Sequence, residues 1–124
     1  MTDHPLRNLS ILVVEDEYFL AAELEEELWD ACAIVVGPTP SVEQALELIE
    51  QTPSLDGAIL DVNLGGETVF PVADRLAAKC IPFVFVTGYR ERDALGLYAD
   101  APRVEKPFLR NAAADALGEI IGQK

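Results

Sequence analysis

The sequence is poor in basic residues and has no long apolar run. Only 9 of its 124 residues are Lys or Arg, against 22 Asp or Glu, so the net charge is −13. A chain this acidic repels phosphate backbones, which excludes a typical nucleic-acid binder. No apolar run approaches the roughly 18 residues of a membrane span, and the N-terminal MTDHPLRN lacks the apolar stretch of a secretory signal. We therefore expect no membrane association and a cytoplasmic location.

Cysteine is also scarce. Cys32 and Cys80 are the two cysteines, and neither belongs to a CxxC motif. This usage favours a reducing compartment over a disulfide framework. We predict two reduced thiols, packed in the interior as small hydrophobes.

The few basic residues are unevenly distributed. No Lys or Arg occurs between Arg7 and Arg75, so a site that combines both signs of charge must be assembled across the fold. Acidic residues form a stripe on the first predicted helix, made of Glu23, Glu26, Glu27 and Asp30. This stripe is interpreted either as a solubilising face or as a docking surface for a basic partner.

Short apolar runs alternate with amphipathic ones along the whole chain. The apolar runs predict five strands, at 11–16, 33–37, 56–62, 82–87 and 102–106. The amphipathic runs predict helices at 18–31, from a Ser41–Gln44 capping box to about 50, from Thr68 to Lys79, at 91–100 and at 109–121. Pro71 falls in the first turn of the third helix, where proline is tolerated. The sequence 37–40, GPTP, predicts a turn, and Gly65 with Gly66 predicts a loop.

This alternation predicts an α/β fold of βαβ units, a doubly wound parallel five-stranded sheet with helices on both faces. The predicted domain spans residues 9–122, after a flexible lead of residues 1–8 that contains an inert His4, and we expect no effector domain after it. Trp29, near the end of the first helix, is expected to pack against the protein.

Polar residues stand where the predicted strands end. Glu15 and Asp16 follow the first strand, Asp61 the third, Thr87 the fourth and Lys106 the fifth. Ligand chemistry in such sheets lies beyond the carboxyl ends of the strands. Two like charges about 4 Å apart repel by roughly 4 kcal/mol at an effective dielectric of about 20, so clustered acids call for protonation, a cation, or both.

Oxygen ligands of this kind suit Mg²⁺ or Mn²⁺. A carboxylate beside such an ion can attack phosphorus, while a hydroxyl and an ammonium hold the other phosphoryl oxygens. Thr87 and Lys106 have the side chains for that role, and Gly88 leaves room for the entering group.

These residues resemble the receiver domain of bacterial two-component response regulators. The resemblance covers nearly the whole chain and rests on VVED (13–16), LDVNLGG (60–66), VTGY (86–89) and EKPF (105–108). It implies a flavodoxin-like (βα)₅ fold with sheet order 2-1-3-4-5. It also implies phosphoryl transfer from the phosphohistidine of a sensor kinase or phosphotransfer protein, with output by protein contact or onward transfer. Such a domain catalyses only its own phosphorylation and dephosphorylation and is not otherwise an enzyme.

The resemblance also implies roles for single residues. Asp61 would be the phosphoacceptor, Thr87 the switch hydroxyl and Lys106 the phosphate-sensing lysine. The metal site would consist of Asp16 as a direct ligand, Glu15 acting through water, Asp61, and the backbone carbonyl of Asn63. The peptide bond between Lys106 and Pro107 would be cis.

The chain departs from the receiver pattern at two points. Arg103 stands where receivers usually carry an aromatic switch residue, and Tyr89 and Tyr98 are nearby candidates for that role. A subgroup of stand-alone receivers with a mobile fourth helix has this pattern, and Gly96 fits it. The acid pair is Glu15–Asp16, where two aspartates are commoner.

Three other functions are compatible with such a fold. A haloacid-dehalogenase-type hydrolase usually requires D-x-D, but Asn63 follows Asp61 at that spacing. A flavodoxin-like cofactor binder needs a phosphate loop without acids after the first strand, where this chain has EDEY. A receiver that is not phosphorylated, and acts purely as a protein-binding module, stays open because of Arg103.

Overall fold

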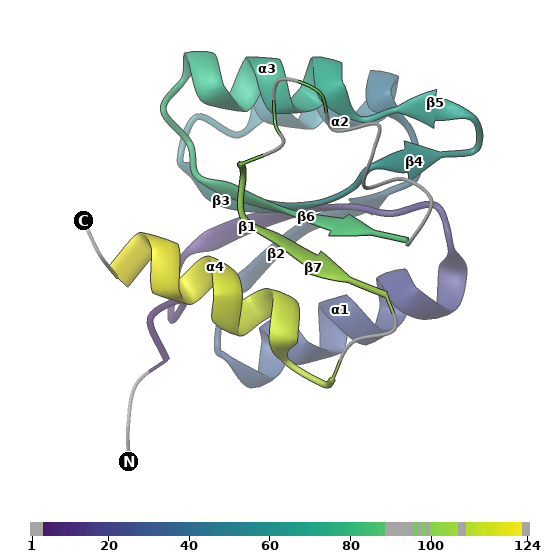
Figure 1. Cartoon of the computed structure of the whole chain (residues 1–124). Helices are drawn as coiled ribbons and strands as arrows, with labels where there is room; N and C mark the ends of the chain where they lie inside the picture. The colour runs from purple at the N-terminus through teal and green to yellow at the C-terminus, as the bar shows by residue number, and fades with distance from the viewer. Residues whose placement is uncertain (1–3, 89–95, 97, 99, 107–108, 123–124) are drawn as a thin grey trace.

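The structure is a computed structural model that describes residues 4–88, 96, 98, 100–106 and 109–122. Its strands are β1 (Ser10–Val14), β2 (Ile34–Thr39), β3 (Leu55–Asp61), β4 (Asn63–Leu64), β5 (Glu67–Thr68), β6 (Phe83–Thr87) and β7 (Arg103–Glu105). Its helices are α1 (Tyr18–Asp30), α2 (Val42–Gln51), α3 (Phe70–Ala78) and α4 (Ala112–Gly122). All of them are labelled in Figure 1.

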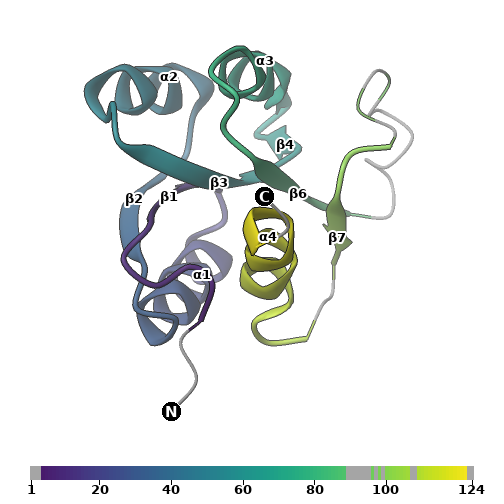
Figure 2. The same cartoon turned by 90° about the vertical axis from the view of Figure 1, so that its left-hand side faces the viewer.

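Five strands form one parallel sheet in the order β2-β1-β3-β6-β7. Because β6 and β7 are the fourth and fifth strands of this sheet, the order is the predicted 2-1-3-4-5. Figure 2 shows α2 and α3 on one face of the sheet and α1 and α4 on the other. The α/β fold class is therefore confirmed. The helix expected at 91–100 falls mainly outside the described residues.

The two faces of the sheet carry separate halves of the core, because successive side chains of a strand point to opposite sides. In β1, Leu12 and Val14 join a cluster with residues of α2 and α3, while Ile11 and Val13 join a cluster with residues of α1 and α4. Central strands buried on both faces read as continuous apolar runs, which is why Ala58 to Leu60 showed no alternation.

Residues 4–8 do not form the predicted flexible lead. Leu6 is completely buried in the cluster beneath α1 and α4. Gly118 of α4 lets the chain approach closely, since a Cβ atom there would lie 3.1 Å from His4 and 3.4 Å from Pro5. His4 is also held by hydrogen bonds to Asp115 and to the backbone N–H of Leu6. The prediction was wrong because one leucine in a polar segment gives no periodicity.

Cys32, Cys80 and Trp29 are exposed, contrary to the predicted burial. Each cysteine directly follows the C-cap of a helix, Ala31 in α1 and Lys79 in α3, and has a left-handed backbone with φ of 62° and 58°. Helix ends of this kind turn the chain at the surface. The thiols are free, as predicted.

Several element boundaries also differ from the prediction. Thr68 does not cap α3 but pairs with Asn63 in the β4–β5 hairpin, whose turn has positive φ at Gly65 and Gly66. The predicted turn at 37–40 belongs largely to β2, and α4 begins three residues later than expected, at Ala112.

Two local predictions for the helices are confirmed. The Ser41 hydroxyl accepts a hydrogen bond of 3.2 Å from the Gln44 N–H and so caps α2. Pro71 lies within the first turn of α3, where its missing N–H leaves no helical bond unmade.

An aromatic cluster joins α3 to the β6 face. The ring of Tyr98 stacks on Phe70 at a centroid distance of 5.6 Å and contacts Phe83 and Phe85 edge-on. Its hydroxyl donates a hydrogen bond to the carboxylate of Asp74 in α3. Burial, reinforced by this carboxylate, raises the pKa of Tyr98 to about 12.

The core assignment predicts a large difference between two isoleucines. Ile59 is 1% exposed and Ile34 is 54% exposed. Ile59→Ala should lower the free energy of unfolding by about 2–5 kcal/mol, because it opens a cavity in the sheet. Ile34→Ala should change it by less than about 0.5 kcal/mol. Urea unfolding followed by circular dichroism measures both, and equal losses would contradict the assignment.

The Tyr98–Asp74 contact predicts a pH-dependent stability. The pKa of Tyr98 is raised in the folded state, so the contact stabilises the folded protein fully at pH values below the unfolded-state pKa of about 10. The stabilisation is lost as the pH rises through about 12. Tyr98→Phe should therefore cost about 1 kcal/mol at neutral pH, and the difference from the wild type should shrink above pH 10. Urea unfolding at a series of pH values tests this, and a difference that does not depend on pH would contradict it.

Candidate functional site

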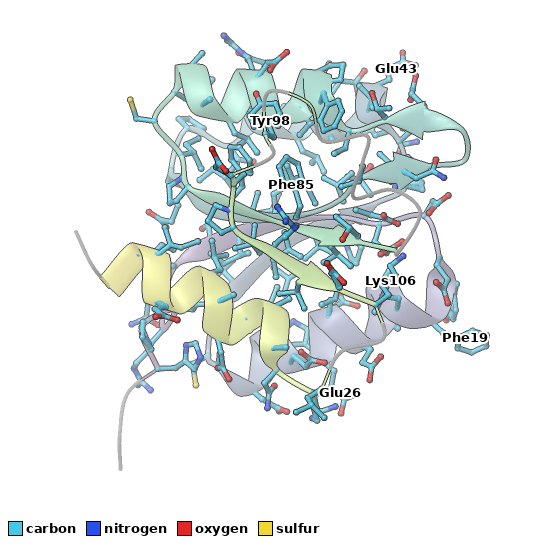
Figure 3. The ribbon with its side chains drawn as sticks, in the orientation of Figure 1. Phe19, Glu26, Glu43, Phe85, Tyr98 and Lys106 are labelled. Carbon is cyan, nitrogen blue, oxygen red and sulfur yellow. The ribbon has the colours of Figure 1, made fainter. Side chains whose placement is uncertain are left out.

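The predicted site residues meet at one edge of the sheet. Asp61 and Thr87 are the last residues of β3 and β6, while Glu15 and Lys106 directly follow β1 and β7. The register pairs Val14 with Leu60 and Thr87 with Glu105, so these strands end at the same level. Figure 3 shows Lys106 at this edge, beyond the end of β7.

Three carboxylates converge there, as predicted. Glu15, Asp16 and Asp61 each offer an oxygen, and these atoms all lie within 4.8 Å of one another. Glu15 and Asp61 are buried, whereas Asp16 is exposed. The group therefore has a closed side within the protein and an open side toward solvent.

Asp61 is held on both oxygens. Its Oδ1 accepts a hydrogen bond of 3.2 Å from the backbone N–H of Asn63, and its Oδ2 accepts one of 3.4 Å from Lys106 Nζ. The rigid end of β3 and these two donors fix the direction of the carboxylate. The carboxylate of Asp61 is thus buried and fixed in direction at a strand end.

Glu15 is less well satisfied. Its Oε2 accepts a hydrogen bond from the Glu17 N–H, but its buried Oε1 has no hydrogen-bond partner among the described residues and lies 3.8 Å from Lys106 Nζ. Burial, together with the neighbouring Asp61, raises the pKa of Glu15 to about 9. Burial and Asp61 thus favour the protonated form of Glu15 when no metal ion is bound beside it.

Lys106 connects the acids to β6. Burial acts to lower the pKa of Lys106, but the Asp61 and Glu15 carboxylates outweigh it, so the net shift is upward. Its backbone N–H donates a hydrogen bond of 2.7 Å to the carbonyl of Thr87. The ammonium is thus a permanent cation, positioned by the strand that ends in Thr87.

Thr87 is completely buried, and its hydroxyl has no hydrogen-bond partner among the described residues. Gly88 follows it and is half-buried, with no side chain to obstruct the approach to the site. By strand alternation, Thr87 lies on the same side of β6 as Phe85, which contacts Tyr98. Figure 3 shows Phe85 and Tyr98 close together on this face.

Asn63 and the following glycines form the rim of the site. Asn63 begins β4, and its side chain accepts a hydrogen bond of 2.9 Å from the Gly66 N–H. A Cβ atom at Gly65 would lie 3.7 Å from Asp16 Oδ2, so the hairpin passes close to the acids. The role of the Asn63 carbonyl in metal binding stays a prediction.

The remaining predicted residues lie apart from this centre or outside the described part of the chain. Arg103 begins β7, is exposed, and pairs in register with Phe85. Pro107 and Tyr89 lie outside the described residues, so the predicted cis bond before Pro107 stays a prediction. Sequence reasoning missed the Tyr98–Asp74 contact, because α3 and the segment before β7 come together only in the fold.

The carboxylate group fits a divalent cation. The buried Oε1 of Glu15 has no hydrogen-bond partner among the described residues, and burial together with the neighbouring Asp61 raises the pKa of Glu15 to about 9, so a cation would stabilise its ionised form. Exposed Asp16 leaves the site open to water and to an entering ligand, as Mg²⁺ sites require.

No helix among the described residues is long and apolar enough to cross a membrane.

Comparisons with known proteins agree with this geometry. SdrG from Sphingomonas melonis Fr1 is 40% identical over 98% of this chain and 99% of its own, with a TM-score of 0.81. The BeF3-activated conformation of SdrG from Pseudomonas melonis Fr1 gives a TM-score of 0.74 at the same identity and coverage. A response regulator receiver protein from Sinorhizobium medicae WSM419 is 25% identical over 94% of this chain and 97% of its own, with a TM-score of 0.78.

No family profile and no curated protein sequence matches the chain. The similarity to SdrG extends over almost the full length of both chains, at an identity that exceeds chance resemblance of folds. The sheet order is the one expected of this fold, and the group of three carboxylates lies at the ends of its strands. The chain therefore belongs to the response regulator receiver family.

Proposed function

We propose that this chain is a phosphoacceptor that receives a phosphoryl group on Asp61 from the phosphohistidine of a sensor kinase or phosphotransfer protein. The observation that carries the proposal is the placement of Asp61. Its carboxylate is buried at the end of β3, 3.4 Å from Lys106 Nζ and within 4.8 Å of oxygens of Glu15 and Asp16.

In the proposed reaction, a carboxylate oxygen of Asp61 attacks phosphorus, and the bond between phosphorus and the imidazole nitrogen breaks. The electron pair of that bond returns to the imidazole, which takes up a proton. Lys106 stabilises the negative charge on the phosphoryl oxygens, and the Thr87 hydroxyl offers a donor that the described residues leave unused. Water later attacks the phosphorus of the acyl phosphate, the bond between phosphorus and the Asp61 oxygen breaks, and inorganic phosphate leaves, which restores the carboxylate.

The metal in this proposal is Mg²⁺ or Mn²⁺. Asp16 and Asp61 would bind it directly, Glu15 would act through water, and the Asn63 carbonyl would complete the protein ligands. The bound ion would neutralise charge on the incoming phosphoryl group. Glu15 would then be ionised, because the attraction of a bound cation for the carboxylate opposes the effect of burial and of Asp61 on its pKa.

The family relationship supports this role, since SdrG is described in a BeF3-activated conformation and shares 40% of its residues with this chain. The output in our proposal is a protein contact or onward phosphoryl transfer, with no enzymatic activity beyond the protein's own phosphorylation. We assign the exchange to the cytoplasm, because two free thiols suit a reducing compartment.

The proposed role of Asp61 as phosphoacceptor can be tested directly. Incubation with a small-molecule phosphodonor and Mg²⁺ should add one labile phosphoryl group, detected by intact-protein mass spectrometry. The adduct should be absent without Mg²⁺ and absent in Asp61→Asn, which keeps the side-chain shape but removes the nucleophile. Asp74→Asn, at an exposed acid on α3, is the control and should be labelled like the wild type. No adduct on the wild-type protein would favour the alternative of a binding module that is not phosphorylated.

The proposed metal site can be tested through the stability of the protein. Mg²⁺ should raise the thermal unfolding midpoint, because it binds the folded state alone. Asp16→Asn should weaken the apparent affinity by at least about tenfold, since loss even of an outer-shell partner typically costs about 10- to 100-fold. Glu17→Gln removes a neighbouring acid outside the carboxylate group and should have a small effect. Equal weakening by both variants would indicate diffuse charge attraction and would contradict a ligand role for Asp16.

A further inference from the structure

A second cluster of acids lies far along α1 from the carboxylate site, beside the start of α4. The two helices cover the same face of the sheet (Figure 2). Between them and the N-terminal residues is a cavity of about 110 Å³, whose wall includes His4, Glu27, Asp30, Asn111 and Asp115. None of these residues takes part in the proposed phosphoryl transfer.

Glu27 is the unusual member of this wall. It is 1% exposed, and its Oε1 accepts a hydrogen bond of 2.8 Å from the backbone N–H of Asn111, just before α4. Its Oε2 is buried and has no hydrogen-bond partner among the described residues. Burial of the carboxylate raises the pKa of Glu27, although the Asn111 N–H and Arg110 counteract this.

The other charged groups of the wall already have partners. The Arg110 guanidinium lies outside the cavity and binds Asp30 at 2.9 Å and Glu26 at 3.3 Å. His4 Nδ1 accepts the Leu6 N–H, so in this arrangement the proton of neutral His4 is on Nε2, which donates to Asp115 at 3.2 Å. Among the described residues, no donor reaches Oε2 of Glu27.

We propose that this cavity receives the side chain of a Lys or Arg from a basic segment of a partner protein, with Glu27 as its acceptor. A metal ion fits less well, because the one carboxylate group close enough to hold a metal, among the described residues, is that of Glu15, Asp16 and Asp61. A Lys or Arg side chain brings a cationic donor on a long apolar stem, which suits a small cavity with the carboxylate of Glu27 in its wall.

Charge around the cavity favours a protein segment over a single small cation. Glu23 and Glu26 of α1 are exposed next to Glu27, and Asp30 and Asp115 continue the acidic surface across to α4. The chain has no Lys or Arg between Arg7 and Arg75, so α1 supplies no cation of its own. A basic segment could place one side chain in the cavity and others on this rim, with electrostatic attraction increasing its rate of association.

The test uses blocked alanine peptides that contain either one arginine or citrulline, its neutral isostere. Titration is followed by two-dimensional NMR of the backbone amides of Asn111 and Ala114. The arginine peptide should shift these signals in a saturable way, and the citrulline peptide should not. Glu27→Gln keeps an oxygen for the Asn111 N–H but removes the charge, so it should weaken binding about tenfold, as expected for loss of a charge-assisted hydrogen bond.

Glu23→Gln is the matched control, because it removes the same charge from the exposed face of α1. It should weaken binding by less than about twofold. Ala31→Val, which fills part of the cavity without changing charge, should also abolish the shifts, and it decides the matter if Glu27→Gln does not fold. Equal effects of Glu23→Gln and Glu27→Gln, or binding that survives Ala31→Val, would overturn the proposal.

Spermidine provides the remaining arm of the experiment. If it binds with the same dependence on Glu27 and more tightly than a peptide with three arginines, the occupant is a free polyamine and the partner-protein assignment is wrong. None of these measurements uses phosphorylation or Mg²⁺, so their outcome is separate from that of the Asp61 labelling.

Discussion

The repulsion between Glu15 and Asp61 is the constraint around which this protein is organised. Two parallel strands end side by side and bring two buried carboxylates, with exposed Asp16, within 4.8 Å of one another. Two ionised acids this close require a counter-charge. Lys106, which follows the edge strand β7, supplies part of it at 3.4 Å from Asp61 and 3.8 Å from Glu15. Protonation of Glu15, whose pKa burial and Asp61 raise to about 9, removes one of the negative charges when no metal ion is bound.

Much of this arrangement could be predicted from sequence, because parallel strands buried on both faces leave a clear signal. A continuous apolar run that stops at a polar residue marks both the strand and its carboxyl end. Asp61 and Thr87 illustrate this, since each is the last residue of its strand. The proximity of strand-end residues that are distant in sequence could be predicted because neighbouring parallel strands end at the same edge of the sheet. Contacts that depend on how helices and loops pack against the sheet leave no such signal in the sequence, so they could not be predicted.

The burial of Leu6 and the contacts of Tyr98 could not be predicted from the sequence. Leu6 stands alone in a polar segment, and its burial depends on the space beneath α1 and α4. Tyr98 finds Phe70 and Asp74 only after α3 has packed on the sheet. Cys32 and Trp29 were misjudged because residue type alone indicated burial, whereas both lie where α1 ends at the surface. Local sequence patterns thus predicted the helices and strands, whereas the burial and contacts of these side chains depend on tertiary packing.

Glu15 and Glu27 are both buried acids on the β1–α1 part of the chain, and each has one unpartnered oxygen. Their surroundings call for different cations. Glu15 has two further carboxylates within reach, which is a donor set for a metal ion. Glu27 accepts one hydrogen bond on Oε1, from the backbone N–H of Asn111. The neighbouring acids Asp30 and Asp115 are bound to Arg110 and His4. A single free oxygen in a narrow cavity suits one hydrogen-bonding cation on a side chain. Since α1 carries Glu27 and begins beside Glu15, a partner bound at the cavity would also lie along the helix that leads to the carboxylates of Glu15, Asp16 and Asp61.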